Sequence, residues 1–285
     1  MTDRPAVDPR WLAGLQAAAA RPPLRPRVPL VAGSSVIGSV EPDFFNKKAF
    51  QAILNGRKQL LKEEHSGSLS WRLMGDVTSS LHVVALAMQA AGLAGAWRSE
   101  QLAVHDHFGQ RKGSIERAAV RPLGISTLAV HLVGMAPDGR VWVQQRALDK
   151  SVDPGLWDTL VGGMVPAAET LDSALARETW EEAGLRIADV QQLRYAGRLA
   201  NSRPCLDGQG TGYMVETLEC YVCTVPKALQ PANQDGEVAQ FRLMTPGELT
   251  KALQHDAFTV DAALILVDAL GLAGAGDLAR ANTHP

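Results

Sequence analysis

One stretch of the sequence, residues 162 to 185 (GGMVPAAETLDSALARETWEEAGL), constrains the fold and the chemistry more than any other. Thr170 carries a hydroxyl that can cap free backbone N–H groups, and Asp172 suits the positive end of a helix dipole. Gly184 belongs to the residue type that most easily follows a helix terminus. The pattern therefore predicts a helix from Thr170 to Gly184.

Carboxylates occupy the face of this helix that would otherwise be buried. Four residues recur at intervals of four, three and four and so share one stripe: Leu171, Leu175, Glu178 and Glu182. Glu181 lies beside this stripe. A cluster of glutamates on a helix is most often a solvated face. Here the glutamates continue an apolar face, which weakens that interpretation.

A second, mostly apolar stripe follows the other side of the helix and consists of Ala176, Trp180 and Ala183. A buried carboxylate is costly unless it is paired or binds a cation. Three clustered carboxylates suit Mg²⁺ or Mn²⁺, hard ions that also bridge phosphate oxygens. Arg177 can pair with Glu181 four residues later, so we expect it to support the cluster rather than bind the metal.

The full spacing resembles the Nudix box, the sequence motif of the MutT-like Nudix hydrolases. The matching residues are Gly163, Glu169, Arg177, Glu178, Glu181, Glu182, Gly184 and Leu185. Thr179 stands where the family usually has an aliphatic residue. That position is expected to pack rather than react, so the departure concerns local packing and leaves the chemistry intact.

The resemblance implies an enzyme, a pyrophosphohydrolase that uses Mg²⁺ or Mn²⁺ and cleaves a diphosphate linked to another group. Glu178, Glu181 and Glu182 match the metal-binding carboxylates of the family. The backbone carbonyl of Gly163 matches a further ligand, and Glu169 matches a glutamate whose role varies. No other cofactor is implied.

The general base is left open, because in this family it lies either in the box or in a later loop. Outside the box the candidate is Glu237, in the loop QDGEV before a predicted strand, with Glu216 behind it. A glutamate after Asp-Gly is otherwise ordinary turn chemistry. We interpret His131, in LAVHLVG, as a core or cleft histidine, and His105 and His107 as exposed turn residues.

The pattern along the chain predicts two folded parts. Residues 1–26 indicate a short helix and a proline-rich arm, and residues 27–120 a small α/β domain with helices near Lys47–Lys62 and Leu81–Leu93. In that domain PLVAGSSVIGSV and EQLAVHDHFGQRKGSIERAAV are strand-like, and we expect the domain to shape substrate choice. Residues 121–285 carry strands before and after the glutamate helix and an apolar C-terminal helix. This favours an α+β fold, here the Nudix α/β/α sandwich with a mixed sheet.

Composition excludes several functional classes. The 285 residues are 46% hydrophobic, enough for a substantial core, and a formal net charge of -2 without a local basic patch argues against nucleic acid or membrane partners. Three cysteines are too few for a disulfide framework, which favours the cytoplasm. Cys220 and Cys223, in CYVC, should point to opposite faces of a strand, so buried thiols are favoured over half a zinc site. A homodimer is left open.

Three further segments bear on the substrate: ERAAVRPLGI, DPGLWDTLVGGMV and LQPANQDGEVAQFRLM. They are similar to a Nudix subgroup related in name to thiamine pyrophosphokinase, whose members carry an additional N-terminal domain. This resemblance covers most of the chain after about residue 30 and implies hydrolysis of thiamine diphosphate, or its oxidised analogues, to the monophosphate. Candidate substrate contacts are Trp142, Trp157, Tyr213 and Glu216, although such aromatic rings are more often core packing.

Three alternatives stay open. A nucleoside diphosphate derivative such as ADP-ribose is the rival substrate. A non-catalytic Nudix-fold module that binds a nucleotide-like ligand should show an eroded box, and the charged positions here show no erosion. An isomerase resembling the isopentenyl diphosphate isomerases would need a reactive cysteine before the box, where WDTLVGG has none.

Overall fold

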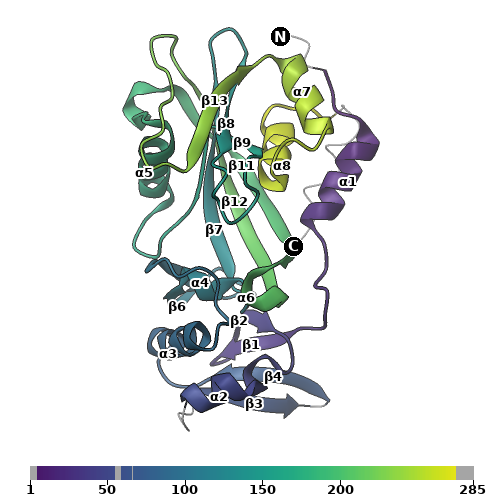
Figure 1. The fold of residues 1–285 in the computed structure, drawn as a ribbon, viewed down its shortest axis with the longest axis vertical. Coiled ribbons are helices and arrows are strands. Elements are labelled where there is room, and N and C mark those ends of the chain that lie inside the picture. Colours follow the sequence, from purple (N-terminus) through teal and green to yellow (C-terminus); the bar gives the residue numbers. More distant parts are fainter. Residues whose placement is uncertain (1–4, 55–58, 66, 274–285) are drawn as a thin grey trace.

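The computed structural model describes residues 5–54, 59–65 and 67–273. Figure 1 shows two parts arranged along the long axis, a large sheet flanked by helices and a smaller unit beneath it. The mixture of sheets and helices is the predicted α+β class. Within the described residues, no helix is both long enough and apolar enough to cross a membrane.

Five strands form the main path of the large sheet, in the order β11, β12, β7, β8 and β13. Their bounds are Gln191–Cys205 (β11), Gly212–Thr224 (β12), Ser126–Met135 (β7), Val141–Arg146 (β8) and Val238–Met244 (β13). β12 and β7 run parallel, whereas the other neighbours on this path are antiparallel. Two short strands, β10 (Val161–Met164) and β9 (Trp157–Asp158), pair with β7 and β8. The sheet is therefore mixed, as predicted.

Helices cover both faces of this sheet. They are α5 (Leu171–Ala183), α7 (Pro246–Gln254), α8 (Val260–Ala269) and α1 (Pro9–Ala19). α5 buries Leu175 against residues of β7 and β12 on one face, while α1, α7 and α8 share a second core on the other face. The predicted α/β/α sandwich is confirmed, and its outer layer includes a helix that precedes the smaller unit.

The ends of α5 are the predicted ones. The Thr170 hydroxyl accepts a hydrogen bond from the Ser173 N–H at 3.2 Å, and the Ser173 hydroxyl accepts one from the Thr170 N–H at 2.9 Å. Gly184 ends the helix with φ of 61°. A side chain at Gly184 would also meet the Ala232 carbonyl oxygen at 2.6 Å, so glycine is required there for two reasons.

The second stripe expected on α5 is wrong in part, because Ala183 is buried but Ala176 and Trp180 are exposed. Thr179 packs inward in their place. Its hydroxyl donates to the Leu175 carbonyl at 2.6 Å, so this departure from the aliphatic residue of the motif leaves no unpaired hydroxyl in the core.

The cysteines of CYVC lie on opposite faces of β12, as predicted. Cys220 belongs to the core under α8, and Cys223 belongs to the core under α5. Both thiols are free, and burial raises the pKa of each to about 12. Such thiols act as small core hydrophobes rather than metal ligands.

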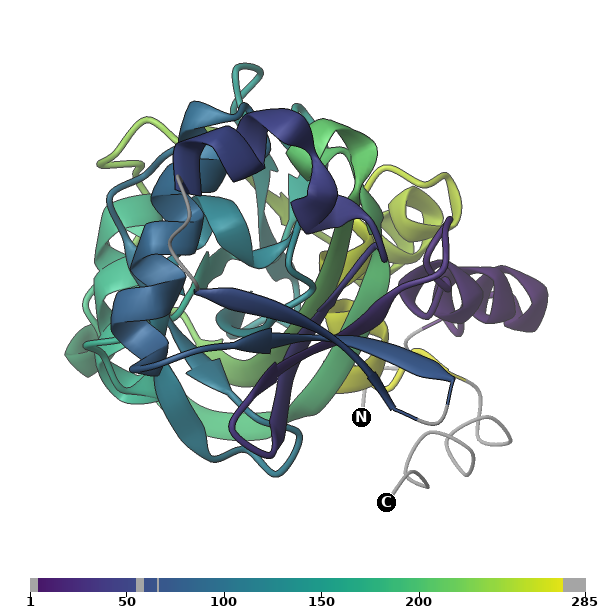
Figure 2. The ribbon, with the colours of Figure 1, turned by 90° about the horizontal axis from the view of Figure 1, so that it is seen from below.

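The smaller unit contains a four-stranded sheet in the order β2, β1, β4 and β3, which lies across the base of the larger part in Figure 2. Its strands and helices are β1 (Val28–Ala32), β2 (Ser35–Val40), η1 (Phe44–Asn46), α2 (Lys48–Leu54), β3 (Leu60–His65), β4 (Ser68–Leu73) and α3 (Val77–Ala90). A hairpin and a short helix then lead to the large sheet: β5 (Gln101–His105), β6 (Arg111–Glu116) and α4 (Arg117–Val120). The remaining short elements are η2 (Ile187–Asp189) and α6 (Asp207–Gly210).

The helix predicted near Lys47–Lys62 is wrong in its second half. α2 covers Lys48–Leu54, but Leu60–His65 forms strand β3, which pairs antiparallel with β4. On β3 the Lys62 ammonium lies 6.0 Å from the centre of the Trp71 ring on β4. Cross-strand contacts of this kind outweigh the helical propensity of LLKEE. The helix predicted near Leu81–Leu93 is confirmed as α3.

Arg27 joins the two parts. Its guanidinium donates to the Ser39 hydroxyl at 3.0 Å in the smaller unit, to the Pro122 carbonyl at 2.8 Å, and to the Thr211 carbonyl at 2.7 Å beside β12. Hydrogen bonds from a charged donor to part-buried carbonyls are worth more than neutral ones. We therefore assign much of the joint's rigidity to this one side chain.

Replacing Arg27 with methionine should lower the free energy of unfolding by about 2 to 4 kcal/mol, because several carbonyls lose their donor. Urea denaturation measures this change. The matched control is Arg25→Met, which removes an exposed arginine 3.6 Å from Glu41 and should cost less than about 0.5 kcal/mol. Equal losses in the two variants would contradict the role given to Arg27.

Candidate active site

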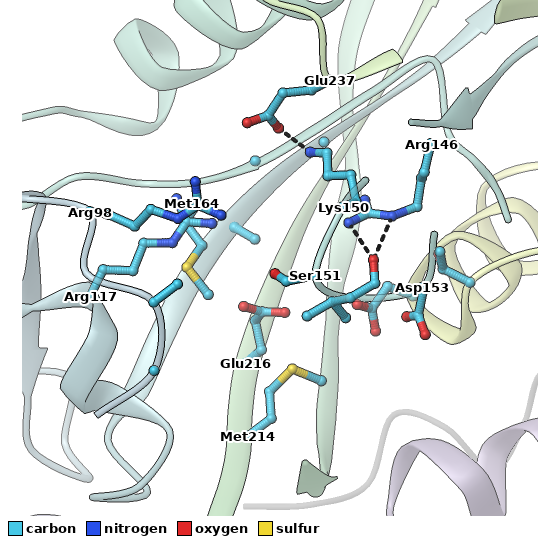
Figure 3. Close-up of a pocket in the computed structure, with 18 of the residues that line it drawn as sticks. Arg98, Arg117, Arg146, Lys150, Ser151, Asp153, Met164, Met214, Glu216 and Glu237 are labelled. Carbon is cyan, nitrogen blue, oxygen red and sulfur yellow. Dashed lines mark hydrogen bonds and ion pairs between the residues drawn. The ribbon is translucent and has the colours of Figure 1, made fainter. Parts of the chain in front are cut away.

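A polar cavity of about 280 Å³ lies where α5, the large sheet and the smaller unit meet (Figure 3). Residues from all three line it, including Arg98, Arg117, Lys150, Gly163, Glu178, Glu181, Glu216 and Glu237. Of the predicted catalytic and metal-binding residues, only Glu182 is missing from this lining. Among the described residues that line the cavity, none is phenylalanine, tyrosine or tryptophan.

Glu182 lies behind the cavity wall in a fully enclosed position. Its Oε2 accepts hydrogen bonds from the Gly162 N–H at 2.8 Å and the Gln144 amide at 2.9 Å. Burial, and then the nearby charge of Glu178, raises the pKa of Glu182 to about 8. Burial also raises the pKa of Glu178. Without a cation, burial therefore favours the protonated form of both carboxyl groups.

Arg177 ties the box glutamates together. Its guanidinium bonds to Glu169 at 2.9 Å, to Glu178 at 2.9 Å and to Glu181 at 2.8 Å. Burial acts to lower the pKa of Arg177, but these carboxylates raise it above its ordinary value. The pairing predicted with Glu181 is confirmed, and Glu169 and Glu178 share the same partner.

Gly163 lies in β10, opposite Val130 of β7, where its lack of a side chain lets a carboxylate approach. A Cβ atom at Gly163 would lie 2.0 Å from Glu178 Oε1. Glu178 therefore reaches the backbone of β10 only because this position is glycine. The Gly163 carbonyl remains a predicted metal ligand.

The donor set fits a hard divalent cation after a rearrangement of side chains. In the part of the chain that the structure describes, no three acidic, histidine or cysteine side chains converge on one metal position. The reason lies in Arg177, which holds Glu178 and Glu181 in ion pairs. A dication would relieve the buried negative charge of Glu178 and Glu182, provided that these ion pairs loosen.

Glu237 lies at the end of a tight loop and faces the cavity. The Asp235 side chain accepts from the Glu237 N–H at 2.8 Å, and Asn233 accepts from the Asp235 N–H at 3.2 Å. Burial acts to raise the pKa of Glu237, but its ion pair with Lys150 outweighs this and lowers it. Glu237 is therefore ionised at neutral pH, as a base must be.

The far end of the cavity is acidic. Glu216, on β12, is buried, and the Thr127 hydroxyl donates to it at 3.3 Å. Among the described residues Glu216 has no cation within ion-pair distance. Burial, and then the charge of Glu216, raises the pKa of Asp261 beside it. Its nearest cation is Arg203, 4.0 Å away.

His131 is a buried histidine at the edge of the cavity, as predicted. The Thr159 hydroxyl donates to the Val161 carbonyl at 2.8 Å and so can only accept from His131 Nδ1, 3.1 Å away. This fixes the proton on Nδ1, and burial lowers the pKa of the ring. The prediction of an exposed turn is correct for His107 but wrong for His105, which ends β5 half-buried.

The three aromatic side chains predicted to contact substrate lie outside the cavity lining. Trp142 and Trp157 pack against the two cores of the large sheet, so their hydrophobic surface is used in folding. The Tyr213 hydroxyl donates to the Arg21 carbonyl at 3.2 Å. The structure therefore places none of the three rings in the cavity lining, whereas Glu216 does line the cavity.

Sequence reasoning missed the cations of the cavity. Arg98 and Arg117 come from the smaller unit, and Lys150 follows β8. None belongs to a local motif, and only the folded arrangement brings them into the same cavity as the box. Asp261, at the start of α8, was missed for the same reason.

The sandwich and the glutamate-bearing helix α5 together define a Nudix type of scaffold, and comparison with known proteins agrees. The profile of the NUDIX domain matches residues 126–264. Nudix hydrolase 20, chloroplastic, of Arabidopsis thaliana is 32% identical over 161 residues, covering 55% of this chain and 42% of that protein. The chain belongs to the Nudix family.

Two further similar proteins are an isomerase and a protein of known crystal structure. Isopentenyl-diphosphate Delta-isomerase of Streptomyces coelicolor is 30% identical over 155 residues, covering 54% of this chain and 75% of that protein. A crystal structure of a Deinococcus radiodurans protein covers 59% of this chain and 99% of its own, with 22% identity and a TM-score of 0.48. The chain spans less than half the length of the Arabidopsis relative.

The raised pKa of Glu182 has a consequence for stability without metal. The folded state holds a proton that the unfolded chain releases near pH 4.5, so stability should fall as pH rises from 4.5 to about 8. The contribution is at most about 1.4 kcal/mol per pH unit. In the Glu182→Gln variant, the free energy of unfolding should depend less steeply on pH, because this titrating group is gone. Urea denaturation in EDTA between pH 5 and 8 checks it, and identical slopes for the two proteins would refute it.

Proposed function

We propose that this protein is a divalent-metal-dependent hydrolase that cleaves a diphosphate linkage. The observation that carries the proposal is a pair of buried carboxyl groups, Glu178 and Glu182, at the wall of a polar cavity, where burial raises the pKa of each. Buried carboxylates with raised pKa values in a cleft are typical of functional sites. The intact charged positions of the box support the same conclusion.

The reaction adds water across the linkage. A water oxygen bonds to one phosphorus and the bridging P–O bond breaks. The water's hydroxyl stays on that phosphorus, and its other proton passes through the base to the leaving phosphate or to solvent. A bound Mg²⁺ or Mn²⁺ supplies charge neutralisation at the phosphate oxygens and makes water a stronger acid. Glu178, Glu181 and Glu182, with the Gly163 carbonyl, would hold this ion.

The chain's own residues orient the reactants. Arg177 keeps Glu178 and Glu181 on one side of the cavity, and Gly162 and Gln144 fix the Glu182 carboxylate. We propose Glu237 as the acceptor of the water proton, since it is ionised and faces the cavity. Its release from Lys150 would raise its basicity at the moment of reaction.

The acidic end of the cavity supports thiamine diphosphate, or its oxidised analogues, as substrate. A thiazolium ring carries a permanent positive charge, and Glu216 offers a buried carboxylate that has no cation within ion-pair distance. Asp261 lies beside it, and burial together with the charge of Glu216 raises its pKa to about 7, so a bound cation would favour the ionised form of Asp261. ADP-ribose, the rival, presents a neutral base and ribose. Its base would stack best on a large aromatic ring, and the described lining residues include no phenylalanine, tyrosine or tryptophan.

Two other classes are weaker candidates. A non-catalytic binding module would not need three box carboxylates kept near a cavity, and an isomerase would need the reactive cysteine that WDTLVGG lacks. We also propose that residues 27–120 shape substrate choice and that the enzyme is cytoplasmic, which free cysteines support. A homodimer stays a prediction.

The first activity test removes one box carboxylate without changing its shape. Glu181→Gln should lower turnover at least about a hundredfold, because a metal ligand is lost. Asp172→Asn, in the first turn of the same helix and outside the cavity lining, is the matched control and should stay within about twofold of the wild type. Release of monophosphate is measured with Mg²⁺ and with EDTA. Normal turnover by the Glu181→Gln variant, or by the wild type in EDTA, would contradict the proposal.

The second activity test compares substrates. We expect a higher kcat/KM for thiamine diphosphate or oxythiamine diphosphate than for ADP-ribose, and Glu216→Gln should lower only the former, by roughly tenfold or about 1.4 kcal/mol. Thr127→Val, which removes only the hydroxyl that bonds Glu216, is the milder companion variant. A tenfold preference of the wild type for ADP-ribose would overturn the thiamine assignment.

A further inference from the structure

Two arginines of the smaller unit face the active-site cavity and have no part in the chemistry proposed above. Arg98 and Arg117 line it across from the Glu237–Lys150 pair, and Figure 3 shows both side chains extending inward from the same side. Arg117 bonds to Glu100 at 2.8 Å. Arg98 is exposed, and within the described residues its guanidinium has no hydrogen bond or ion pair.

The backbone around these arginines is held by a buried carboxylate. Glu116 is 0% exposed, and its Oε1 accepts from the Arg98 N–H at 3.0 Å and from the Ala118 N–H at 3.4 Å. One side chain therefore fixes the stretches that carry both guanidiniums. Ser99, next to Arg98, has φ of 56°, a left-handed conformation that residues other than glycine seldom adopt. Such strain persists where the surroundings enforce it, often at binding sites.

The same stretch is joined to the loop that leads into α5. The Ala167 N–H donates to the Gln101 carbonyl at 2.7 Å, and the Arg117 N–H donates to the Glu100 carbonyl at 2.8 Å. These backbone bonds set the position of the arginines relative to the glutamates of the box. The cationic wall and the metal-binding wall are thus parts of one framework.

The electrostatic effect of the arginines already reaches across the cavity. Burial acts to raise the pKa of Glu237, and the charges of Lys150, Arg117 and Arg98 lower it. A metal held by the box would neutralise part of the negative charge of the substrate's phosphates. A terminal phosphate carries a second negative charge with a pKa near 6, and guanidinium groups bind such a group through paired hydrogen bonds.

We propose that Arg98 and Arg117 form an anion subsite that binds the free terminal phosphate of the substrate. This inference rests on the proposed function and narrows its substrate class to diphosphate monoesters. A diphosphate substituted at both ends lacks the second charge and would place its extra group against two guanidiniums. Arg98 is the stronger determinant, because Arg117 is already paired with Glu100.

A matched pair of ligands tests the subsite by binding alone. The non-hydrolysable α,β-methylene analogues of ADP and ADP-ribose share the adenosine and both phosphorus atoms, and differ in whether the terminal phosphate is free. Isothermal titration with Mg²⁺ should give at least about tenfold tighter binding of the ADP analogue to the full chain. Arg98→Gln should weaken that ligand at least about fivefold and leave the ADP-ribose analogue within about twofold.

Controls separate charge from structure. Arg98→Lys keeps the charge and should retain part of the selectivity, whereas Arg25→Gln, an exposed arginine outside the cavity, should change neither affinity. Because Arg98 is exposed and unpaired among the described residues, its variants should fold normally, as checked by circular dichroism. Equal weakening of both ligands, or of neither, by Arg98→Gln would overturn the subsite.

Hydrolysis is measured separately on ADP, thiamine diphosphate and ADP-ribose. If none is cleaved while the ADP analogue still loses affinity in Arg98→Gln, the proposed function fails and the subsite stands. If diphosphates are cleaved normally and Arg98→Gln leaves the binding of the ADP analogue and the KM for ADP unchanged, the subsite fails and the proposed function stands.

Discussion

The guanidinium of Arg177 is the interaction on which the site depends. It neutralises part of a helix surface that would otherwise repel itself, and it links the loop before α5, through Glu169, to the helix glutamates. Glu182 has no such partner and relies on the Gly162 N–H and an amide. The helix therefore packs with one carboxylate sealed in and two held at the cavity edge. A metal ion at the proposed site would have to compete with Arg177 for these two, so its affinity would be set partly by an ion pair.

The parts predicted well from the sequence are those whose causes are local. Thr170 and Gly184 fix the ends of α5 through caps that need only neighbouring residues. The alternation of Cys220 and Cys223 follows from strand geometry alone. The box joins β10 to α5 over a short stretch of sequence. The fixed spacing of Gly163 and Glu178 within the box is therefore enough to predict that the two residues lie close together.

The predictions that the structure does not match concern contacts between segments distant in the sequence. Leu60–His65 forms a strand because it pairs with β4, and the sequence of this segment alone does not predict that pairing. Trp142 and Trp157 were predicted to contact substrate, but the sandwich uses their surfaces for packing. Arg98 belongs to no sequence motif, and only the fold brings it into the cavity that the residues of α5 line.

The packing of α1 against α8 gives the molecule an unusual connectivity. The chain first contributes to the outer layer of the sandwich, leaves it to build the smaller unit, and returns through α4 into β7 (Figure 1). The smaller unit is thus an insertion anchored at two crossings, with Arg27 bridging them. A unit tethered at both ends resists the swinging motion of a lid on a single linker. Ligands would enter and leave this cavity through movements of side chains and loops, and the two halves would keep their relative position throughout a catalytic cycle.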